Sequence, residues 1–371
     1  MTSSGPAPVN EQLELIFEAA PTAMLMVDSN RRIVLANSLI LEIFGYTQGE
    51  MHGQAVEMLI PMRYRESHPQ QVADFFANPA RRKMGVGREV EGCRKCGESF
   101  PCELALSPMR IGDQVFVLVA LADITERKRA ERESRLAHEI QQAMLPKAPP
   151  EFPGFDIAGR SVPADATGGD FYDYVPLPEG ELAVVIGDVS GHGFGPALLS
   201  ATARSFLRSL IMTQEDAGKA LSLTNELIIE ESLAGQFVTV MALVFDSQTG
   251  SLRYVGAGHE SYVFDRNGAL KLTLASTGFP LGLESGQSYS LSDPVLLEPG
   301  DFIVALTDGV VEAASPKGEL FGKARLTDSM KTVAQFSAEH IVESLYEIVE
   351  DFRRDKPQND DITAVVVKFR A

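Results

Sequence analysis

The chain contains 371 residues, which is enough for two domains and a connection, because a domain usually has roughly 100–200 residues. Its 51 acidic residues outnumber its 33 Lys and Arg, and the formal net charge of −18 argues against nucleic acid or an anionic membrane as a partner. No apolar run approaches the roughly 20 residues that cross a bilayer, and the first residues lack the pattern of a secretion signal. We therefore expect a cytoplasmic protein.

Residues 11–124 follow a flexible tail of small residues and prolines at positions 1–10. Two short apolar runs at 23–27 and 33–36, separated by the turn signal Ser29-Asn30-Arg31, predict a β-hairpin. Helical patterns occupy the middle of the region. Three more strand-like segments follow at 87–94, 99–107 and 114–122. We predict five strands, with helices between the second and the third.

Residues 125–147 form the predicted connection. They contain no Gly and are rich in Glu, Arg and Ala, so we expect one long helix. Apolar residues recur at seven-residue spacing, which favours a coiled coil between two copies of the chain and hence a homodimer. A helix packed on its own domain explains the pattern equally well. The residues of this seam are Ala130, Leu136, Ala137, Ile140 and Met144.

Residues 150–371 change to a pattern of apolar strands around central helices, after several prolines that end the linker helix. The helical segments lie at 197–210, 221–233 and 338–352. The strand-like segments lie at 182–186, 238–245, 302–306 and 362–369.

Four acidic motifs stand at the ends of strand-like segments in this second region. Ordinary turn chemistry explains a single Asp-Gly pair, but it explains four such motifs poorly. Carboxylates about 4 Å apart repel each other by about 1 kcal/mol in water and about 4 kcal/mol at a partly buried site, so a cluster requires cations. Hard oxygen ligands select Mg²⁺ or Mn²⁺. The aspartates in the four motifs are Asp170, Asp188, Asp308 and Asp360.

Two divalent ions held by carboxylates can generate a hydroxide nucleophile and neutralise a phosphoryl group under in-line attack. This chemistry predicts a phosphatase or a nuclease. The strongly negative charge disfavours the nuclease, because no basic patch is evident that would hold a polynucleotide.

At these residues the chain resembles the PPM-type metal-dependent serine/threonine protein phosphatases, in the bacterial branch typified by the SpoIIE and RsbU regulators of sigma factors. The resemblance covers about residues 135–370. It rests on AHEIQQAMLP, GGDFYDY, GDVSGHG, AGH, TGFPLG, LTDGVVEA and NDDIT, in this order. It implies an α+β fold in which two central antiparallel sheets lie between helices, an αββα sandwich.

The resemblance also implies roles for the site residues. Asp188 bridges two Mn²⁺ or Mg²⁺ ions, and the carbonyl of Val189 binds one of them. Asp308 and Asp360 hold the second ion, and Asp170 binds through metal-coordinated water. The implied reaction is hydrolysis of phosphoserine or phosphothreonine by a metal-bridging hydroxide. The implied substrate is a phosphorylated partner protein, an anti-sigma-factor antagonist.

Three other polar residues of these motifs are expected to have lesser roles. Asp361 adjoins a ligand and is expected to support the site without binding metal. His192, four positions after Asp188, is a candidate for the acid that protonates the leaving alkoxide. His259 stands in Gly-His-Glu where relatives often have Gly-His-Asn, and a structural role is expected for it.

Residues 11–124 resemble PAS sensor domains at Ile43-Phe44-Gly45-Tyr46, at Glu98-Ser99-Phe100-Pro101 and at the final Asp-Ile-Thr-Glu-Arg. The stretch that ends in His68, and Gly-Val-Gly-Arg ending in Arg88, resemble the oxygen-sensing FixL haem domains. There the matching His binds iron and the matching Arg contacts the gas. The PAS ligand is left open, with haem as one candidate.

Two alternative functions compete with a phosphatase: a sensor histidine kinase and a catalytically silent scaffold. Leu136-Ala137-His138-Glu139-Ile140 mimics the phosphoacceptor box of sensor histidine kinases, but no ATP-binding motif follows. A catalytically silent scaffold is disfavoured by the four intact aspartates. The three cysteines are too few for a four-ligand zinc site, and we expect free thiols. They are Cys93, Cys96 and Cys102.

Overall fold

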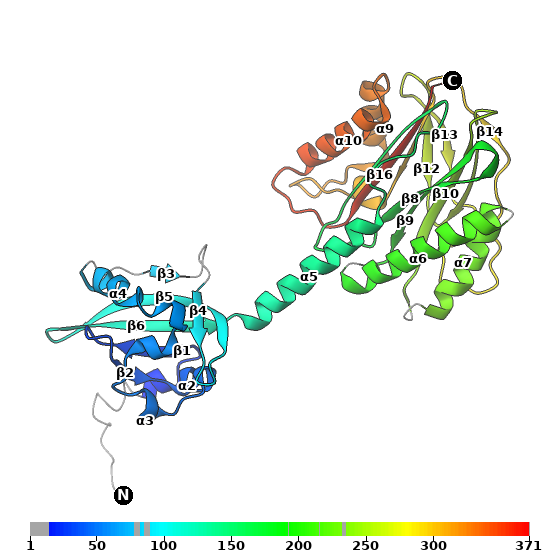
Figure 1. Ribbon diagram of the computed structural model, residues 1–371. Helices are drawn as coiled ribbons and strands as arrows, with labels where there is room; N and C mark the ends of the chain where they lie inside the picture. The colour runs from blue at the N-terminus through cyan, green and yellow to red at the C-terminus, as the bar shows by residue number, and fades with distance from the viewer. Residues whose placement is uncertain are drawn as a thin grey trace, which may run out of the picture. The chain divides into compact units, whose positions relative to one another are not determined.

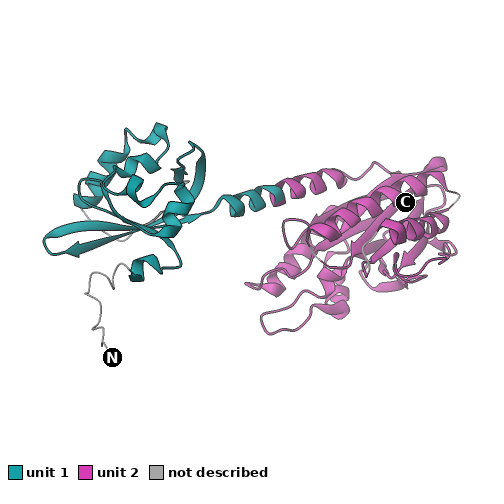
Figure 2. Ribbon diagram, turned by 90° about the horizontal axis from the view of Figure 1, so that it is seen from below, with its two compact units in different colours: residues 1–133 teal, residues 134–371 magenta. Residues whose placement is uncertain are grey.

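The computed structural model describes residues 15–370 except 78–81, 85–89, 192, 215 and 232–234. The chain divides into two compact units, residues 1–133 and 134–371 (Figure 2). Within the described residues, none of the helices combines the length and the apolar character that crossing a bilayer requires.

The first unit contains an antiparallel sheet in the order β2-β1-β6-β5, with β3 and β4 both paired to β5 (Figure 1). The five strands expected from the sequence are present, and β3 is an additional short one. It pairs with residues 104–106 of β5 and β4 with residues 99–102, so both lie along one edge. The strands are β1 (Ala23–Val27), β2 (Ile33–Ala36), β3 (Arg82–Met84), β4 (Val90–Cys93), β5 (Ser99–Ile111) and β6 (Gln114–Asp123).

Short helices lie between β2 and β3, and one face of the sheet buries apolar residues against them. Phe44 and Phe100 meet edge to face, with ring centroids 5.3 Å apart. Asn37 begins α2 as its N-cap, because its side chain accepts a hydrogen bond from the backbone of Ile40. The helical elements are α2 (Ser38–Phe44), α3 (Gln48–Met51), η1 (Val56–Leu59), η2 (Met62–Tyr64) and α4 (His68–Ala77).

The predicted linker helix is α5 (Thr125–Met144), which runs from the first unit into the second. Asp123 caps its start, because one carboxylate oxygen accepts hydrogen bonds from the backbone and the hydroxyl of Thr125. The other oxygen pairs with Arg94 at 2.6 Å. The beginning of α5 is therefore anchored to the first unit.

The second unit has two five-stranded antiparallel sheets, in the orders β14-β11-β10-β9-β8 and β13-β12-β15-β16-β7. The first sheet contains β8 (Phe171–Pro176), β9 (Glu181–Val189), β10 (Val238–Asp246), β11 (Ser251–Ala257) and β14 (Val295–Leu296). The second contains β7 (Phe155–Val162), β12 (Ser261–Phe264), β13 (Leu270–Leu274), β15 (Phe302–Leu306) and β16 (Ile362–Phe369).

Helices cover the outer face of each sheet (Figure 1). On β9, Leu182, Val184 and Ile186 face the other sheet, whereas Ala183 and Val185 pack against helices. This alternation builds three apolar layers and the αββα sandwich that the family resemblance implies. Helices α6 (Phe194–Thr213) and α7 (Ala217–Glu231) cover the first sheet, and α9 (Gly322–Val333) and α10 (Ala338–Arg353) the second.

Candidate active site

The four aspartates come from two pairs of neighbouring strands. Asp170 directly precedes β8, and Asp188 is the last residue but one of β9. Asp308 follows β15 as the first residue of the short helix α8 (Asp308–Val311), and Asp360 stands two residues before β16. Since both strand pairs are antiparallel, the start of one strand lies beside the end of its partner. Each pair thus brings two aspartates to one end of its sheet.

Hydrogen bonds join these two sheet ends. The hydroxyl of Thr307, next to β15, donates to Oδ2 of Asp170 at 2.6 Å. Oδ2 of Asp361, next to β16, accepts from the backbone of Gly169 at 2.6 Å. The structure therefore brings together all four aspartates that the sequence singles out.

Burial and neighbouring charges shift the pKa values of these carboxylates. Burial, followed by the charges of Asp308 and Asp360, raises the pKa of Asp188 to about 7. Burial and then the charge of Asp188 raise the pKa of Asp170 well above its usual range, and Asp170 is only 5% exposed. Burial and Asp360 also raise the pKa of Asp308. A site with this much negative charge favours a bound cation.

Gly169 leaves space in this corner of the site. A Cβ atom at Gly169 would lie 2.7 Å from the carbonyl oxygen of Val189 and 3.3 Å from Oδ1 of Asp188. The carbonyl and the carboxylate thus face the same small volume, which a side chain would fill. A backbone oxygen and carboxylates fit the hard-oxygen preference of Mg²⁺ and Mn²⁺.

Among the residues that the structure describes, no three Asp, Glu, His or Cys side chains converge closely enough to form a ready-made metal site. The four aspartates are therefore candidate ligands, and their carboxylate oxygens are of the kind that Mg²⁺ and Mn²⁺ prefer.

Gln141 on α5 contacts the same region, and sequence reasoning missed it. Its amide nitrogen donates to the carbonyl of Gly168 at 2.5 Å, and its amide oxygen accepts from the backbone of Gly168 at 3.0 Å. One turn earlier, Nδ1 of His138 lies 2.6 Å from the carbonyl oxygen of Ala166. The histidine that mimics a kinase phosphoacceptor thus contacts the loop that leads to Asp170.

His259 lies beneath the site. It is 7% exposed, Nδ1 is 3.2 Å from the hydroxyl of Thr239, and burial lowers its pKa to about 4. Thr239 is opposite Asp188 in the sheet. A buried neutral ring in this position fits the structural role expected for His259. His192, the other candidate, lies outside the described residues.

The candidate haem residues and the three cysteines belong to the first unit. His68 begins α4, and its Nδ1 lies 3.2 Å from a carboxylate oxygen of Glu57. Arg88 lies outside the described residues. All three cysteines are free, and burial raises the pKa of Cys102 to about 12. The three unpaired cysteines are consistent with the free thiols that we expect from the sequence.

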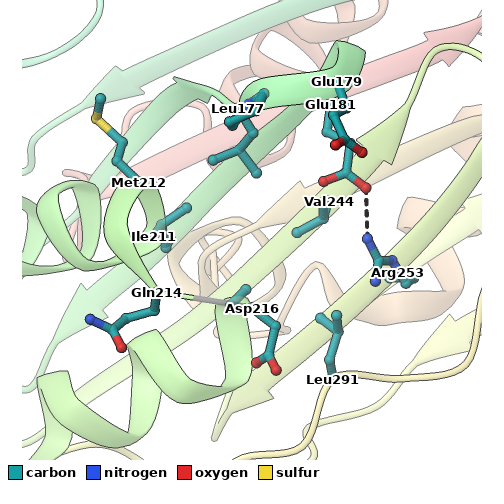
Figure 3. Close-up of a pocket in the computed structure, with 12 residues that line it drawn as sticks. Leu177, Glu179, Glu181, Ile211, Met212, Gln214, Asp216, Val244, Arg253 and Leu291 are labelled. Atoms are coloured by element: carbon teal, nitrogen blue, oxygen red, sulfur yellow. Dashed lines mark hydrogen bonds and ion pairs between the residues drawn. The ribbon is translucent and has the colours of Figure 1, made fainter.

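A cavity of about 230 Å³ lies at the other end of β9 from Asp188 (Figure 3). Its walls include the buried side chains of Ile211 and Val244 and the acidic side chains of Glu181 and Asp216. None of the four aspartates lines it. The cavity is therefore separate from the candidate active site.

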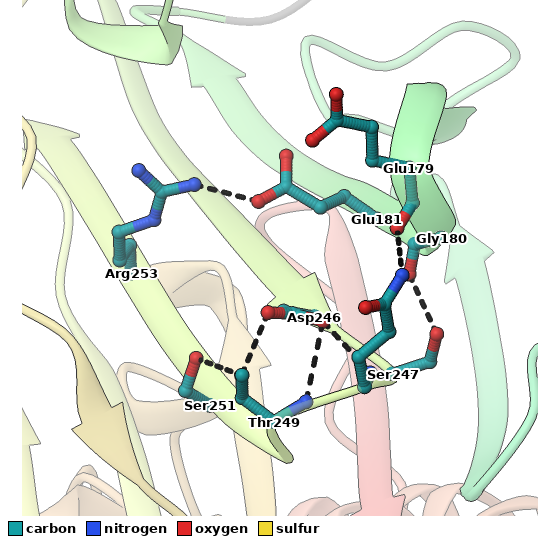
Figure 4. Close-up of polar contacts among 9 residues, drawn as sticks. Glu179, Gly180, Glu181, Asp246, Ser247, Thr249, Ser251 and Arg253 are labelled. Carbon is teal, nitrogen blue, oxygen red and sulfur yellow. Dashed lines mark hydrogen bonds and ion pairs between the residues drawn. The ribbon is translucent and has the colours of Figure 1, made fainter.

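Polar contacts fix the sheet end beside this cavity (Figure 4). Arg253 pairs with Glu181 at 2.6 Å, and the hydroxyl of Ser247 donates to the carbonyl of Gly180 at 2.7 Å. The hydroxyl of Thr249 donates to Asp246 at 2.7 Å. The Ser247 contact joins the turn after β10 to the turn before β9, the Thr249 contact lies within the first of these turns, and the Arg253 pair joins β11 to β9. These contacts account for the polar cluster structurally.

Two parts of the chain match models of known protein families. Residues 178–370 match stage II sporulation protein E (SpoIIE), and residues 11–124 match the PAS fold. The SpoIIE match covers more than half of the chain, so the chain belongs to the SpoIIE family. The second unit is a SpoIIE-type PP2C phosphatase domain, which follows an N-terminal PAS domain, as the resemblance predicts.

Individual relatives agree with this assignment. Protein IcfG of Synechocystis sp. is 31% identical over 257 residues, which span 62% of this chain but only 40% of IcfG. Phosphoserine phosphatase RsbU of Bacillus subtilis is 28% identical over 240 residues, 64% of this chain and 70% of RsbU. The SiaA-PP2C domain of Pseudomonas aeruginosa has the same fold, with a TM-score of 0.58 and 24% identity over 66% of this chain and 99% of that domain.

Proposed function

We propose that this protein is a PAS-regulated phosphatase that removes phosphate from phosphoserine or phosphothreonine of a partner protein, with two Mn²⁺ or Mg²⁺ ions as cofactors. The observation that carries the proposal is the convergence of Asp170, Asp188, Asp308 and Asp360 at the joined ends of two sheets. Burial, followed by the charges of Asp308 and Asp360, raises the pKa of Asp188 to about 7, and bound divalent ions would offset this concentration of negative charge.

Each aspartate has a distinct part in this proposal. Asp188, the carbonyl of Val189, Asp308 and Asp360 would hold the two ions. Asp170, the most buried of the four aspartates, would support them through metal-coordinated water. When bound, the ions supply the activated water and neutralise charge on the phosphoryl group.

The partner is proposed from the relatives. RsbU is named a phosphoserine phosphatase, and so is RsbP of the same organism. We propose a phosphoserine-bearing anti-sigma-factor antagonist as the substrate. A folded partner presents its phosphoserine on the surface, which suits the exposed side chains of Asp308 and Asp360.

Regulation is proposed to pass through α5, which begins at Thr125, directly after the PAS domain, and contacts the loop before Asp170 through Gln141. A rotation or shift of such a helix is transmitted without unfolding. Leu136, Ile140 and Met144 lie on one exposed face of α5 and are 56%, 58% and 36% exposed. We propose that a second copy of the chain covers this face in a homodimer.

A haem group in the PAS domain is a separate proposal. The contact between Nδ1 of His68 and Glu57 leaves Nε2 as the nitrogen for iron. Protein produced with haem supplied should then have a Soret band that His68→Ala removes. A colourless protein would contradict this proposal and leave the phosphatase proposal untouched.

The experiment on the phosphatase compares Mn²⁺-dependent phosphate release from a phosphoserine peptide and an aryl phosphate by the wild type, Asp188→Ala and Asp308→Asn. We expect activity in the wild type and its loss in both variants. A wild type that is inactive at every metal concentration and with both substrates would support the silent scaffold.

A further inference from the structure

The loop at residues 163–170 connects β7 to β8 and ends in the candidate ligand Asp170. It lacks regular secondary structure of its own, so backbone hydrogen bonds within a sheet do not fix its position. The groups that hold the loop therefore determine where Asp170 lies. Two of these groups belong to Thr307, which directly follows β15, and to Asp361, which directly precedes β16.

Asp361 holds the loop by its backbone. Oδ1 accepts a hydrogen bond from the N–H of Ala164 at 2.8 Å, and Oδ2 accepts from Gly169 at 2.6 Å and from Asp170 at 3.4 Å. The side chain is 5% exposed. An ionised carboxylate only accepts hydrogen bonds, so it matches three converging N–H groups.

Glycines allow this close approach. A Cβ atom at Gly168 would collide with the carboxylate of Asp361, and one at Gly309 would collide with its backbone carbonyl. Asp361 is thus enclosed on two sides by backbone without side chains. These two glycines occur in the motifs that also carry Asp170 and Asp308.

Thr307 holds the other end of Asp170. Its hydroxyl donates to Oδ2 of Asp170 at 2.6 Å and accepts from the N–H of Thr363 at 3.0 Å. The side chain is fully buried. Asp361 therefore fixes the backbone of Asp170, while Thr307 orients its carboxylate.

We propose that Asp361 and Thr307 are positioning residues that fix Asp170 and thereby set the metal affinity of the site. The inference rests on the proposed function, because it assigns these residues to the same metal site. Both adjoin strands whose ends carry Asp308 and Asp360, so one rigid strand pair places three of the four aspartates. Loss of an outer-shell partner commonly weakens metal binding by about 10–100-fold.

The test measures Mn²⁺ affinity of the full chain by titration calorimetry. Asp361→Asn replaces an acceptor with an amide N–H₂ that faces N–H donors, and Thr307→Val removes the hydroxyl at nearly constant shape. We expect about 10–100-fold weaker binding in both variants. Thr307→Ser keeps the hydroxyl and should bind within about threefold of the wild type.

The matched control is Asp156→Asn. Asp156 is another carboxylate of this domain that accepts a backbone hydrogen bond, from Ala338 at 2.9 Å, away from the four aspartates. It should leave Mn²⁺ affinity unchanged. Equal affinities in the wild type, Asp361→Asn and Thr307→Val would overturn the inference, as would a Thr307→Ser variant as weak as Thr307→Val.

Hydrogen exchange of the metal-free protein separates this inference from the proposed function. We expect the amides of Gly169 and Asp170 to exchange at least about tenfold faster in Asp361→Asn than in the wild type. A wild type that binds no Mn²⁺ would contradict the proposed function. Amide exchange in Asp361→Asn that equals that of the wild type would overturn the positioning role, whatever the result of the Mn²⁺ titration.

Discussion

Gln141 of the linker helix makes two hydrogen bonds to the backbone of Gly168. Its side-chain amide donates to the carbonyl at 2.5 Å and accepts from the N–H at 3.0 Å. Gly168 stands two residues before Asp170. A change in the position of α5 would therefore reach a proposed metal ligand through two hydrogen bonds and two peptide units.

Gln141→Glu tests this connection. Glutamate can still accept a hydrogen bond from the N–H of Gly168, but its carboxylate repels the Gly168 carbonyl. The variant therefore loses one of the two hydrogen bonds without a large change in side-chain volume. We expect the Mn²⁺ concentration for half-maximal phosphatase activity to rise about tenfold. The same change at the neighbouring Gln142 should have no effect. An equal response of the two variants would exclude a specific role of Gln141.

Gly169→Ala tests the corner beside Val189. The added Cβ would lie 2.7 Å from the Val189 carbonyl oxygen, within the space assigned to an ion. We expect metal binding to weaken by at least about tenfold, while the far-ultraviolet circular dichroism stays unchanged. At Gly195, where an added Cβ would have an ordinary contact 3.6 Å from Gln236, alanine should be tolerated. Full affinity in Gly169→Ala would show that no ion uses this space.

Much of this fold follows from the sequence because apolar alternation marks buried strands. Residues 302–306 and 362–369 were predicted with the bounds of β15 and β16. The three-residue strand β3 was not predicted, because Arg82 and Lys83 give it no apolar alternation. Its existence depends on pairing with β5, which is a tertiary effect.

The site was predictable only in part. Asp188 and Asp308 are marked by a buried strand that runs into an Asp beside Gly. The contacts of Gln141 with Gly168 and of Thr307 with Asp170 join residues 27 and 137 positions apart, so no local pattern reveals them. Gln141 lies within the AHEIQQAMLP motif, which was the one available signal.

The stability of the metal-free protein should depend on pH through Asp188. Its pKa is about 7 in the folded chain and about 4 in an unfolded one, so between these values the folded state binds more protons. The protonated Asp188 side chain therefore contributes fully to the stability of the folded state below about pH 4, and this contribution is lost as the pH rises through about 7.

Asp188→Asn removes this dependence. In EDTA, raising the pH from about 5 to about 8 should destabilise the wild type relative to the variant. The melting temperature of the variant should therefore rise relative to that of the wild type over this range. Saturating Mn²⁺ should reverse the difference at pH 8, because only the wild type retains the bridging carboxylate. A difference that is constant with pH would show that Asp188 titrates normally.

Ile140→Glu tests the proposed dimer. A charge in the centre of the apolar face of α5 opposes its burial against a second copy. We expect sedimentation to show a dimer for the wild type and a monomer for Ile140→Glu at micromolar concentration. Arg135→Glu, on another face of α5, should remain dimeric. A monomeric wild type would contradict the dimer.

The number of Mn²⁺ ions bound per chain, measured by electron paramagnetic resonance of the free ion during titration, tests the central claim most directly. We expect two bound ions in the wild type. In Asp188→Ala we expect no ion to bind, or only weak binding to remain. A wild type that binds no Mn²⁺, or an Asp188→Ala variant that still binds two ions tightly, would contradict this claim.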